Sequence, residues 1–249
     1  MNLLEVENVT VKADNKIILR DISFTIKEKE NYILFGPNGS GKTTIINAIQ
    51  GIPNYKIVSG SVKFMGNDIT KKDIDERSKL GIAMGFQLPP EIKGVKLSDM
   101  LKVCLGKKSD YDFNKEEKKS IEAFKLTDLL NRDINVEFSG GEKKRAEILQ
   151  LIFLNPRLLL IDEPDSGVDV ESLKLIASEI QSFVDRTRNS SLIITHKGDI
   201  LDYMKAEYAC VLIEGKMHCF ENPRKIFENI KMFGYKECIA CQKRIEKAW

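Results

Sequence analysis

A glycine-rich segment near the start of the chain carries residues that can bind phosphate groups. It consists of Gly36, Pro37, Asn38, Gly39, Ser40, Gly41, Lys42, Thr43 and Thr44. The glycines allow successive backbone N–H groups to turn toward one anion, where a Cβ would clash. A helix expected to begin near Lys42 would add the positive end of its dipole. Lys42 supplies a positive charge to the outer phosphates and the Thr43 hydroxyl suits Mg²⁺, so the segment predicts a nucleotide site.

Two carboxylates follow an apolar run later in the chain. Asp162 and Glu163 come directly after the run at residues 158–161. Asp162 can hold Mg²⁺ through water, facing the Thr43 hydroxyl. Glu163 can polarise the water that attacks the terminal phosphate. Apolar runs that end in acids are also common at ordinary strand ends, so the pair alone leaves both interpretations open. Together with the phosphate-binding segment, the pair predicts hydrolysis of the nucleotide.

His196 is one of two histidines and closely follows the apolar run at residues 192–194. A lone histidine is commonly a structural residue that bonds the backbone. Here it ends a strand that is expected beside the strand carrying Glu163, which favours a contact with the terminal phosphate. Lys42, Glu163 and His196 are therefore assigned as catalytic residues. The other histidine, His218, has no such context and receives no assignment.

Three continuous apolar runs, at residues 32–35, 158–161 and 192–194, must position these side chains. Runs of this length suit parallel strands that are covered on both faces, although periodicity alone does not exclude a buried helix. Ligands of open α/β sheets gather at the carboxyl ends of such strands. The sequence therefore predicts an α/β core whose chemistry lies at one edge of the sheet.

Two further regions surround this core. Residues 3–11 and 22–26 alternate between polar and apolar types and are bounded by polar turns, which predicts short strands. Residues 97–154 intersperse charged and apolar types in a helical pattern. The expected fold is a phosphate-loop NTPase core with a mixed or parallel sheet, an antiparallel β subdomain and an inserted α-helical subdomain.

The composition excludes several kinds of partner. Lysine and arginine number 39 against 37 acidic residues, so no overall field favours nucleic acid or an anionic membrane. The most apolar stretch, residues 149–161, is interrupted by polar residues, and a membrane span needs about 20 apolar residues. The amino terminus has no pattern typical of a secretory signal. Five cysteines do not make a disulfide framework in a chain of this length, and a cytoplasmic protein with reduced thiols is expected.

A second glycine motif decides between classes of phosphate-loop ATPase. Residues 138–145 read Phe-Ser-Gly-Gly-Glu-Lys-Lys-Arg and resemble the signature of the ATP-binding cassette family. The order of motifs also matches that family: the phosphate loop, Gln87 after a strand, the signature, the two carboxylates, the turn at residues 166–169, and His196. The resemblance extends from about residue 3 to about residue 235.

The resemblance implies a mechanism as well as a fold. In this family two chains pack head to tail with two ATP molecules and Mg²⁺ between them, so an ATP-dependent homodimer is implied. Ser139, Gly140 and Gly141 of one chain would bind the γ-phosphate held by the other, again at a helix start. Asp169 would lie across the dimer seam, and Gln87 would touch Mg²⁺ and relay partner contacts.

The resemblance also implies how the chain is divided. One cassette domain is expected over residues 1–249, with a core lobe at 1–86 and 157–235, a helical lobe at 87–156, and a tail at 236–249. The tail contains Cys238 and Cys241. A lone Cys-x-x-Cys pair could be half of a zinc site, a redox pair, a docking point for iron or sulfur chemistry, or incidental thiols.

Several local strings resemble one branch of the family, the SufC ATPase subunits of the SUF iron–sulfur cluster assembly machinery. These strings are residues 86–95, 135–145 and 165–169, and Asp165 is informative because transporter ATPases usually carry another residue there. The resemblance implies SufB/SufD-like scaffold proteins as partners. The segment from Gln87 to Val95 is expected to be a loop and to contact the partner, although it could merely pack on its own lobe. The alternative function is the ATP-binding subunit of a membrane transporter.

One departure from the family concerns the nucleobase. Many members stack adenine on an aromatic residue in the early strand region, but residues 9–16 contain none. Binding is therefore expected to depend on the phosphates and to discriminate weakly among nucleotides.

Overall fold

The computed structural model describes residues 1–235, so the predicted tail with Cys238 and Cys241 lies outside the described residues. The strands of the described part are β1 (Asn2–Ala13), β2 (Lys16–Lys27), β3 (Asn31–Phe35), β4 (Tyr55–Phe64), β5 (Asn67–Asp68), β6 (Ile82–Gly85), β7 (Ile92–Lys96), β8 (Asp133–Ile134), β9 (Leu158–Asp162), β10 (Ser190–Thr195), β11 (Tyr208–Ile213) and β12 (Lys216–Glu221). The helices are α1 (Lys42–Gln50), α2 (Ile74–Lys79), α3 (Leu97–Cys104), α4 (Lys115–Ala123), α5 (Gly140–Leu154), α6 (Val170–Arg186) and α7 (Pro223–Phe233), with short 3-10 turns η1 (Thr127–Leu129) and η2 (Asp199–Asp202).

The central sheet has the strand order β12-β11-β3-β10-β9-β6. Its strands pair in parallel, except that β12 runs antiparallel to β11. The three apolar runs of the sequence form β3, β9 and β10, which are buried along their whole length. Successive residues of these strands face opposite cores, so Ile193 packs in one apolar cluster and Leu192 and Ile194 in the other. The predicted α/β class is confirmed.

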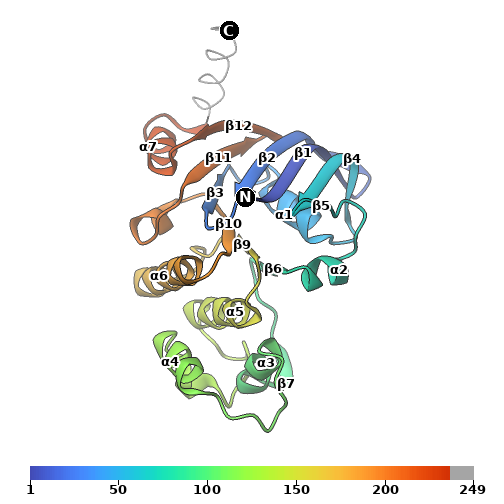
Figure 1. Ribbon diagram of the computed structural model, residues 1–249. Coiled ribbons are helices and arrows are strands. Elements are labelled where there is room, and N and C mark those ends of the chain that lie inside the picture. Colours follow the sequence, from blue (N-terminus) through green and yellow to red (C-terminus); the bar gives the residue numbers. More distant parts are fainter. Residues whose placement is uncertain (236–249) are drawn as a thin grey trace.

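The two faces of this sheet are covered by different elements. One face packs on α1 and on the antiparallel sheet β2-β1-β4-β5, through residues such as Leu4, Ile22 and Ile45. The other face packs on α5 and α6, through residues such as Leu149 and Ile176. Figure 1 shows these helices below the central sheet and the antiparallel strands beside it. The central sheet is buried on both faces, which explains why its strands read as continuous apolar runs.

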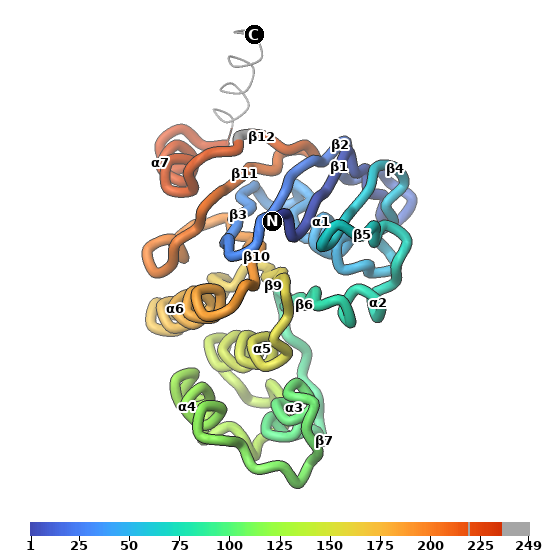
Figure 2. Tube along the Cα trace, in the orientation of Figure 1, coloured from blue at the N-terminus to red at the C-terminus, as the bar shows by residue number. Residues whose placement is uncertain are grey.

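A helical region lies at one end of the molecule, formed by α3, α4 and the small β7–β8 ribbon (Figure 1). The chain reaches it after β6 and returns to the sheet through α5, as Figure 2 shows along the tube. Its apolar side chains, which include Leu97, Leu101 and Phe124, join the core beneath α5. No helix among the described residues is long and apolar enough to cross a bilayer.

The segment from Gln87 to Val95, expected as a loop, is partly a strand. β7 begins at Ile92, which pairs with Ile134 of β8. The side-chain amide of Asn135 donates a hydrogen bond to the Pro90 carbonyl at 2.7 Å. This pairing joins residues about forty positions apart, which sequence periodicity does not reveal.

Candidate nucleotide site

The glycine-rich loop joins β3 to α1 and lines a cavity of about 270 Å³. Gly39 and Gly41 have φ values of 78° and 105°, a left-handed region that favours glycine. A Cβ on Gly36 would lie 2.4 Å from the Leu212 carbonyl oxygen, so the loop approaches β11 too closely for a side chain. The residues around the cavity are Ile18, Asn38, Gly39, Gly41, Lys42, Thr43, Thr44, Gln87 and Glu163.

The start of α1 adds two features that attract an anion. The helix has no side-chain hydrogen bond at its N-cap, Gly41, so its first N–H groups are available to a ligand. Lys42 is buried and donates hydrogen bonds from Nζ to the carbonyls of Gly36 (2.8 Å) and Pro37 (3.0 Å). Burial lowers the pKa of Lys42, and the nearby carboxylates of Glu163 and Asp162 oppose this shift. A phosphate group bound in the cavity would add negative charge beside this ammonium, beyond that of the two carboxylates.

Thr43 and Asp162 meet at the carboxyl end of the sheet. The Thr43 hydroxyl donates a hydrogen bond to Asp162 Oδ2 at 2.8 Å. The other carboxylate oxygen, Oδ1, is buried and has no hydrogen-bond partner within residues 1–235. Burial raises the pKa of Asp162, while the hydrogen bond from Thr43 opposes that rise. A hydroxyl and an unsatisfied carboxylate oxygen are hard oxygen ligands, which fit Mg²⁺.

Glu163 lies at the centre of the polar cluster, with both carboxylate oxygens engaged. Oε2 accepts a hydrogen bond from the Gln87 side-chain amide at 2.9 Å, and Oε1 lies 3.1 Å from Nδ1 of His196. The Glu163 backbone has a φ of 46°, and its N–H donates to the Ile194 carbonyl of β10 at 3.0 Å. β9 and β10 are parallel neighbours in which Asp162 pairs with Ile194. This confirms the expectation that His196 ends the strand next to that of Glu163.

The signature motif forms the start of α5, with Ser139 at the N-cap. The Ser139 hydroxyl oxygen accepts a hydrogen bond from the Glu142 N–H, and Glu142 accepts one from the Ser139 N–H, which together make a capping box. A Cβ on Gly140 would lie 2.5 Å from the Gly167 carbonyl oxygen. The signature is therefore packed directly on the turn that leads to α6.

Asp169 lies beside the signature glycines, at the start of α6. It is the N-cap of α6 and accepts hydrogen bonds from the Ser172 N–H and hydroxyl, both at 2.8 Å. A Cβ on Gly141 would lie 2.5 Å from the Ser172 hydroxyl and 3.0 Å from Asp169 Oδ2. The start of α5 and the start of α6 therefore form one packed unit.

The predicted nucleotide-binding residues fall into two groups within one chain. The phosphate loop, Gln87 and Glu163 line a common cavity, with Asp162 and His196 bonded to residues of that group. Ser139, Gly140, Gly141 and Asp169 are not among the residues that line it. One copy therefore offers a phosphate cavity and, separately, a helix start of the type that binds anions.

We expect Gly140→Ala to weaken the assembly of two copies while leaving ATP binding to the single chain unchanged. The new methyl group would push the Gly167 carbonyl away and displace the turn that carries Asp169. Overpacking of this kind costs about 1–3 kcal/mol. A dimer that needs the original position of the turn would lose up to that free energy, so the dimerisation constant should fall by about fivefold to 150-fold. Sedimentation velocity with ATP measures the assembly, and calorimetry measures nucleotide binding. A variant that dimerises like the unchanged chain would contradict this expectation.

Sequence patterns did not reveal several residues near the site. Ile18 of β2 lines the cavity although it lies far from the glycine-rich loop in the sequence. Asp165, noted only as a family marker, is buried and accepts a hydrogen bond from the Thr195 hydroxyl, next to His196. Lys144 and Glu147 are buried beside the strand end that leads to Gln87. The residues of α5 show no clear hydrophobic periodicity, so the sequence offers no signal for the last two.

Comparison with known proteins gives consistent matches. Residues 19–166 match the family model described as ABC transporter. The chain is 39% identical over 226 residues to the probable ATP-dependent transporter ycf16 of Antithamnion sp., covering 86% of this chain and 89% of that protein. It is 38% identical to the probable ATP-dependent transporter SufC of Escherichia coli strain K12, covering 86% of this chain and 90% of that protein.

Solved structures agree on the fold. A crystal structure of MJ1267, described as the ADP conformation of an ATP-binding cassette of an ABC transporter, superimposes with a TM-score of 0.76. The two sequences are 28% identical, and the match covers 96% of this chain and 99% of that one.

Proposed function

Because the chain belongs to the ABC transporter family and is therefore an ATP-hydrolysing cassette, we propose that two copies pair head to tail around MgATP to move iron–sulfur scaffold proteins. One observation carries the pairing: a single chain keeps its phosphate cavity apart from its signature helix start. A second copy turned by a twofold rotation would bring each signature to the other copy's cavity. Each ATP would then lie between two helix starts, and both attract its phosphates.

The phosphate loop binds the triphosphate through its backbone N–H groups and Lys42. The Thr43 hydroxyl and, through water, Asp162 would hold Mg²⁺, and the supporting observation is that Asp162 Oδ1 has no hydrogen-bond partner among the described residues. When bound there, the ion would supply positive charge beside the phosphate oxygens. Gln87, whose side-chain amide donates a hydrogen bond to Glu163, is assigned to the same metal.

Glu163 is assigned as the general base for the attacking water. Its carboxylate is oriented by Gln87 on one oxygen and by His196 on the other. Orientation matters because proton transfer requires the base to lie within hydrogen-bond reach of the water. His196 can also contact the γ-phosphate once a nucleotide occupies the cavity, because the ring is only half-buried.

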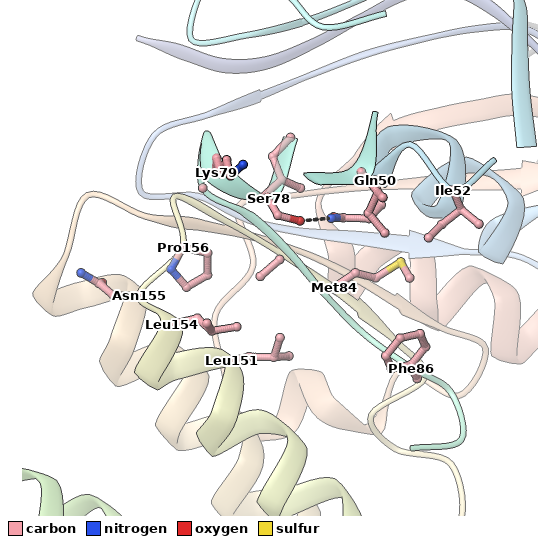
Figure 3. A pocket seen from close by; sticks show the side chains of 14 residues that line it. Gln50, Ile52, Ser78, Lys79, Met84, Phe86, Leu151, Leu154, Asn155 and Pro156 are labelled. Atoms are coloured by element: carbon pink, nitrogen blue, oxygen red, sulfur yellow. Dashed lines mark hydrogen bonds between the residues drawn. The ribbon is translucent and has the colours of Figure 1, made fainter. Parts of the chain in front are cut away.

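A groove beside the Gln87 segment is the proposed contact for the partner. It has a volume of about 480 Å³ and lies between β6, α2 and the end of α5. Figure 3 labels Met84, Phe86, Leu151 and Leu154 around it. Phe86 and Leu154 are more than half exposed, at 53% and 51%, and Leu88 nearby is 86% exposed. Exposed apolar side chains around a hollow are typical of a protein-binding surface.

The Escherichia coli relative is named SufC. The local strings of this chain resemble the ATPase subunit of that name in the iron–sulfur assembly machinery, and this supports scaffold proteins as the partner. The test is affinity purification of the tagged chain from its own cells, followed by mass spectrometry. SufB/SufD-like proteins should be recovered. Recovery of an integral membrane permease instead would favour the transporter alternative and overturn the scaffold assignment.

A surface variant sharpens this test. Leu154→Glu should lose the captured partner, because a carboxylate replaces an exposed apolar side chain that lines the groove. Met232→Glu is the matched control: Met232 is similarly exposed, at 65%, but lies on α7 away from the groove. Equal capture by both variants would show that the groove is not the contact.

A further inference from the structure

A buried pair of opposite charges on α5 grips the strand end that leads to Gln87. Lys144 and Glu147 are only 3% and 7% exposed, and Lys144 Nζ lies 3.2 Å from Glu147 Oε2. Glu147 Oε1 accepts a hydrogen bond from the Phe86 N–H at 2.6 Å. Lys144 Nζ donates one to the Phe86 carbonyl at 2.5 Å. Both backbone polar groups of Phe86 are therefore bonded to this one pair.

Such a pair is not the most stable solution for a buried position. Burial raises the pKa of Glu147, and the nearby Lys144 only opposes that rise. Two well-packed apolar side chains in place of a buried ion pair are often equally or more stable. The strand end is also pressed against the pair, since a Cβ on Gly85 would lie 3.3 Å from the Glu147 carboxyl carbon. Lys144 and Glu147 therefore fix the position of the Phe86 backbone, and the burial of their charges costs some folding free energy.

The position of the Phe86 backbone affects the orientation of the Glu163 carboxylate. Phe86 is followed directly by Gln87, whose amide holds Oε2 of Glu163 at 2.9 Å. The Phe86 side chain, by contrast, is 53% exposed and lines the groove of Figure 3. The pair itself lies on α5, where Lys144 is about one turn and Glu147 about two turns after the signature glycines. The Phe86 peptide unit therefore connects three parts of the molecule. It bonds to the signature helix α5, its side chain lines the groove, and the next residue, Gln87, bonds to the carboxylate of Glu163.

We propose that Lys144 and Glu147 act as a positioning clamp, which holds Phe86 so that Gln87 orients the Glu163 carboxylate for hydrolysis. Neither Lys144 nor Glu147 lines the nucleotide cavity, so the clamp acts through Gln87. A movement of α5, or of a ligand bound in the groove, would therefore change the position of the Glu163 carboxylate. This inference rests on the roles of Gln87 and Glu163 under the proposed function.

The test is a double variant, Lys144→Met with Glu147→Leu, which removes both charges together and so leaves no unpaired buried charge. Thermal unfolding should remain cooperative, with a melting temperature somewhat below that of the unchanged chain, because the Phe86 N–H and carbonyl lose their partners. The kcat for ATP should fall about tenfold to a hundredfold, as expected for a misplaced catalytic group. The Kd for ATP, measured by calorimetry, should stay within about twofold, because the phosphate loop is untouched.

A second background separates positioning from a general structural effect. In a chain that already carries Gln87→Ala, the double variant should lower kcat no further, because coupled residues are not additive. Gln150→Leu is the control on the same helix: among the described residues its side chain is hydrogen-bonded to the carbonyl of Ala146 alone, and kcat should be unchanged.

Two results would overturn the clamp. One is a folded double variant with unchanged kcat, and the other is a full further loss of kcat in the Gln87→Ala background. Either result leaves the proposed function intact if the unchanged chain hydrolyses ATP and Glu163→Gln does not. An active Glu163→Gln variant would instead refute the assigned base, and the clamp with it.

Discussion

Replacement of Glu163 by glutamine should lower the rate of ATP hydrolysis about a hundredfold or more, the size expected for loss of a general base. Glutamine has nearly the same shape, so the hydrogen bonds with Gln87 and His196 can be largely retained. The carboxylate charge that would accept a proton from water is lost. The binding site for ATP is unchanged, because Lys42 and the phosphate loop are not altered.

The same variant should also accumulate as a dimer when ATP is present. A neutral side chain removes repulsion between Glu163 and the γ-phosphate, and no hydrolysis follows to release the two copies. Phosphate release measures the rate, and sedimentation velocity measures the dimer. Glu116→Gln on α4 is the matched control, since its side chain is 79% exposed and far from the cavity in the fold. Normal hydrolysis by Glu163→Gln would refute the assignment of the base.

Replacement of Lys42 by alanine should weaken ATP binding at least about tenfold to a hundredfold, the cost of losing a charge-assisted hydrogen bond to phosphate. The ammonium is already buried at the loop, where it bonds two carbonyls, so little ordering is needed when the nucleotide arrives. Calorimetry with Mg²⁺ measures the affinity. Lys56→Ala, on β4 and outside the cavity, should bind ATP normally.

Lys42→Ala should weaken ATP binding without lowering the melting temperature of the nucleotide-free chain. Burial depresses the pKa of Lys42 in the folded chain, so the charged form costs folding free energy below its pKa, including at neutral pH. Removing the charge should therefore leave the melting temperature of the nucleotide-free chain unchanged or slightly higher. A large loss of melting temperature would show that Lys42 supports the loop rather than the ligand.

The parts of the site that were predictable from the sequence are local ones. The turn from β3 to α1 is set by consecutive residues, so glycine spacing alone predicts the phosphate cavity. The apolar runs ending at Asp162 and near His196 predict adjacent parallel strands, and the sheet confirms this. The motif order of the whole chain indicated the ATP-binding cassette family, and the family match confirms it.

The parts that were missed depend on segments far apart in the chain. The hydrogen bond between Phe86 and Glu147 spans 61 residues, and no pattern within α5 shows which backbone its charges meet. The close approach of Gly140 to the Gly167 carbonyl is equally a product of how α5 and α6 pack. The pairing of β7 with β8 turned an expected loop into a strand, because its register is set across the helical region.

The unpaired carboxylate oxygen of Asp162 has a consequence for the life of the protein in the cell. Asp162 Oδ1 has no hydrogen-bond partner among the described residues, and a cation bound there would lower the free-energy cost of burying that oxygen. Any ligand that binds only the folded chain stabilises it by an amount that grows with ligand concentration, about 2.7 kcal/mol at a hundredfold excess over Kd. If MgATP is that ligand, the resistance of the chain to proteolysis should rise with the concentration of MgATP.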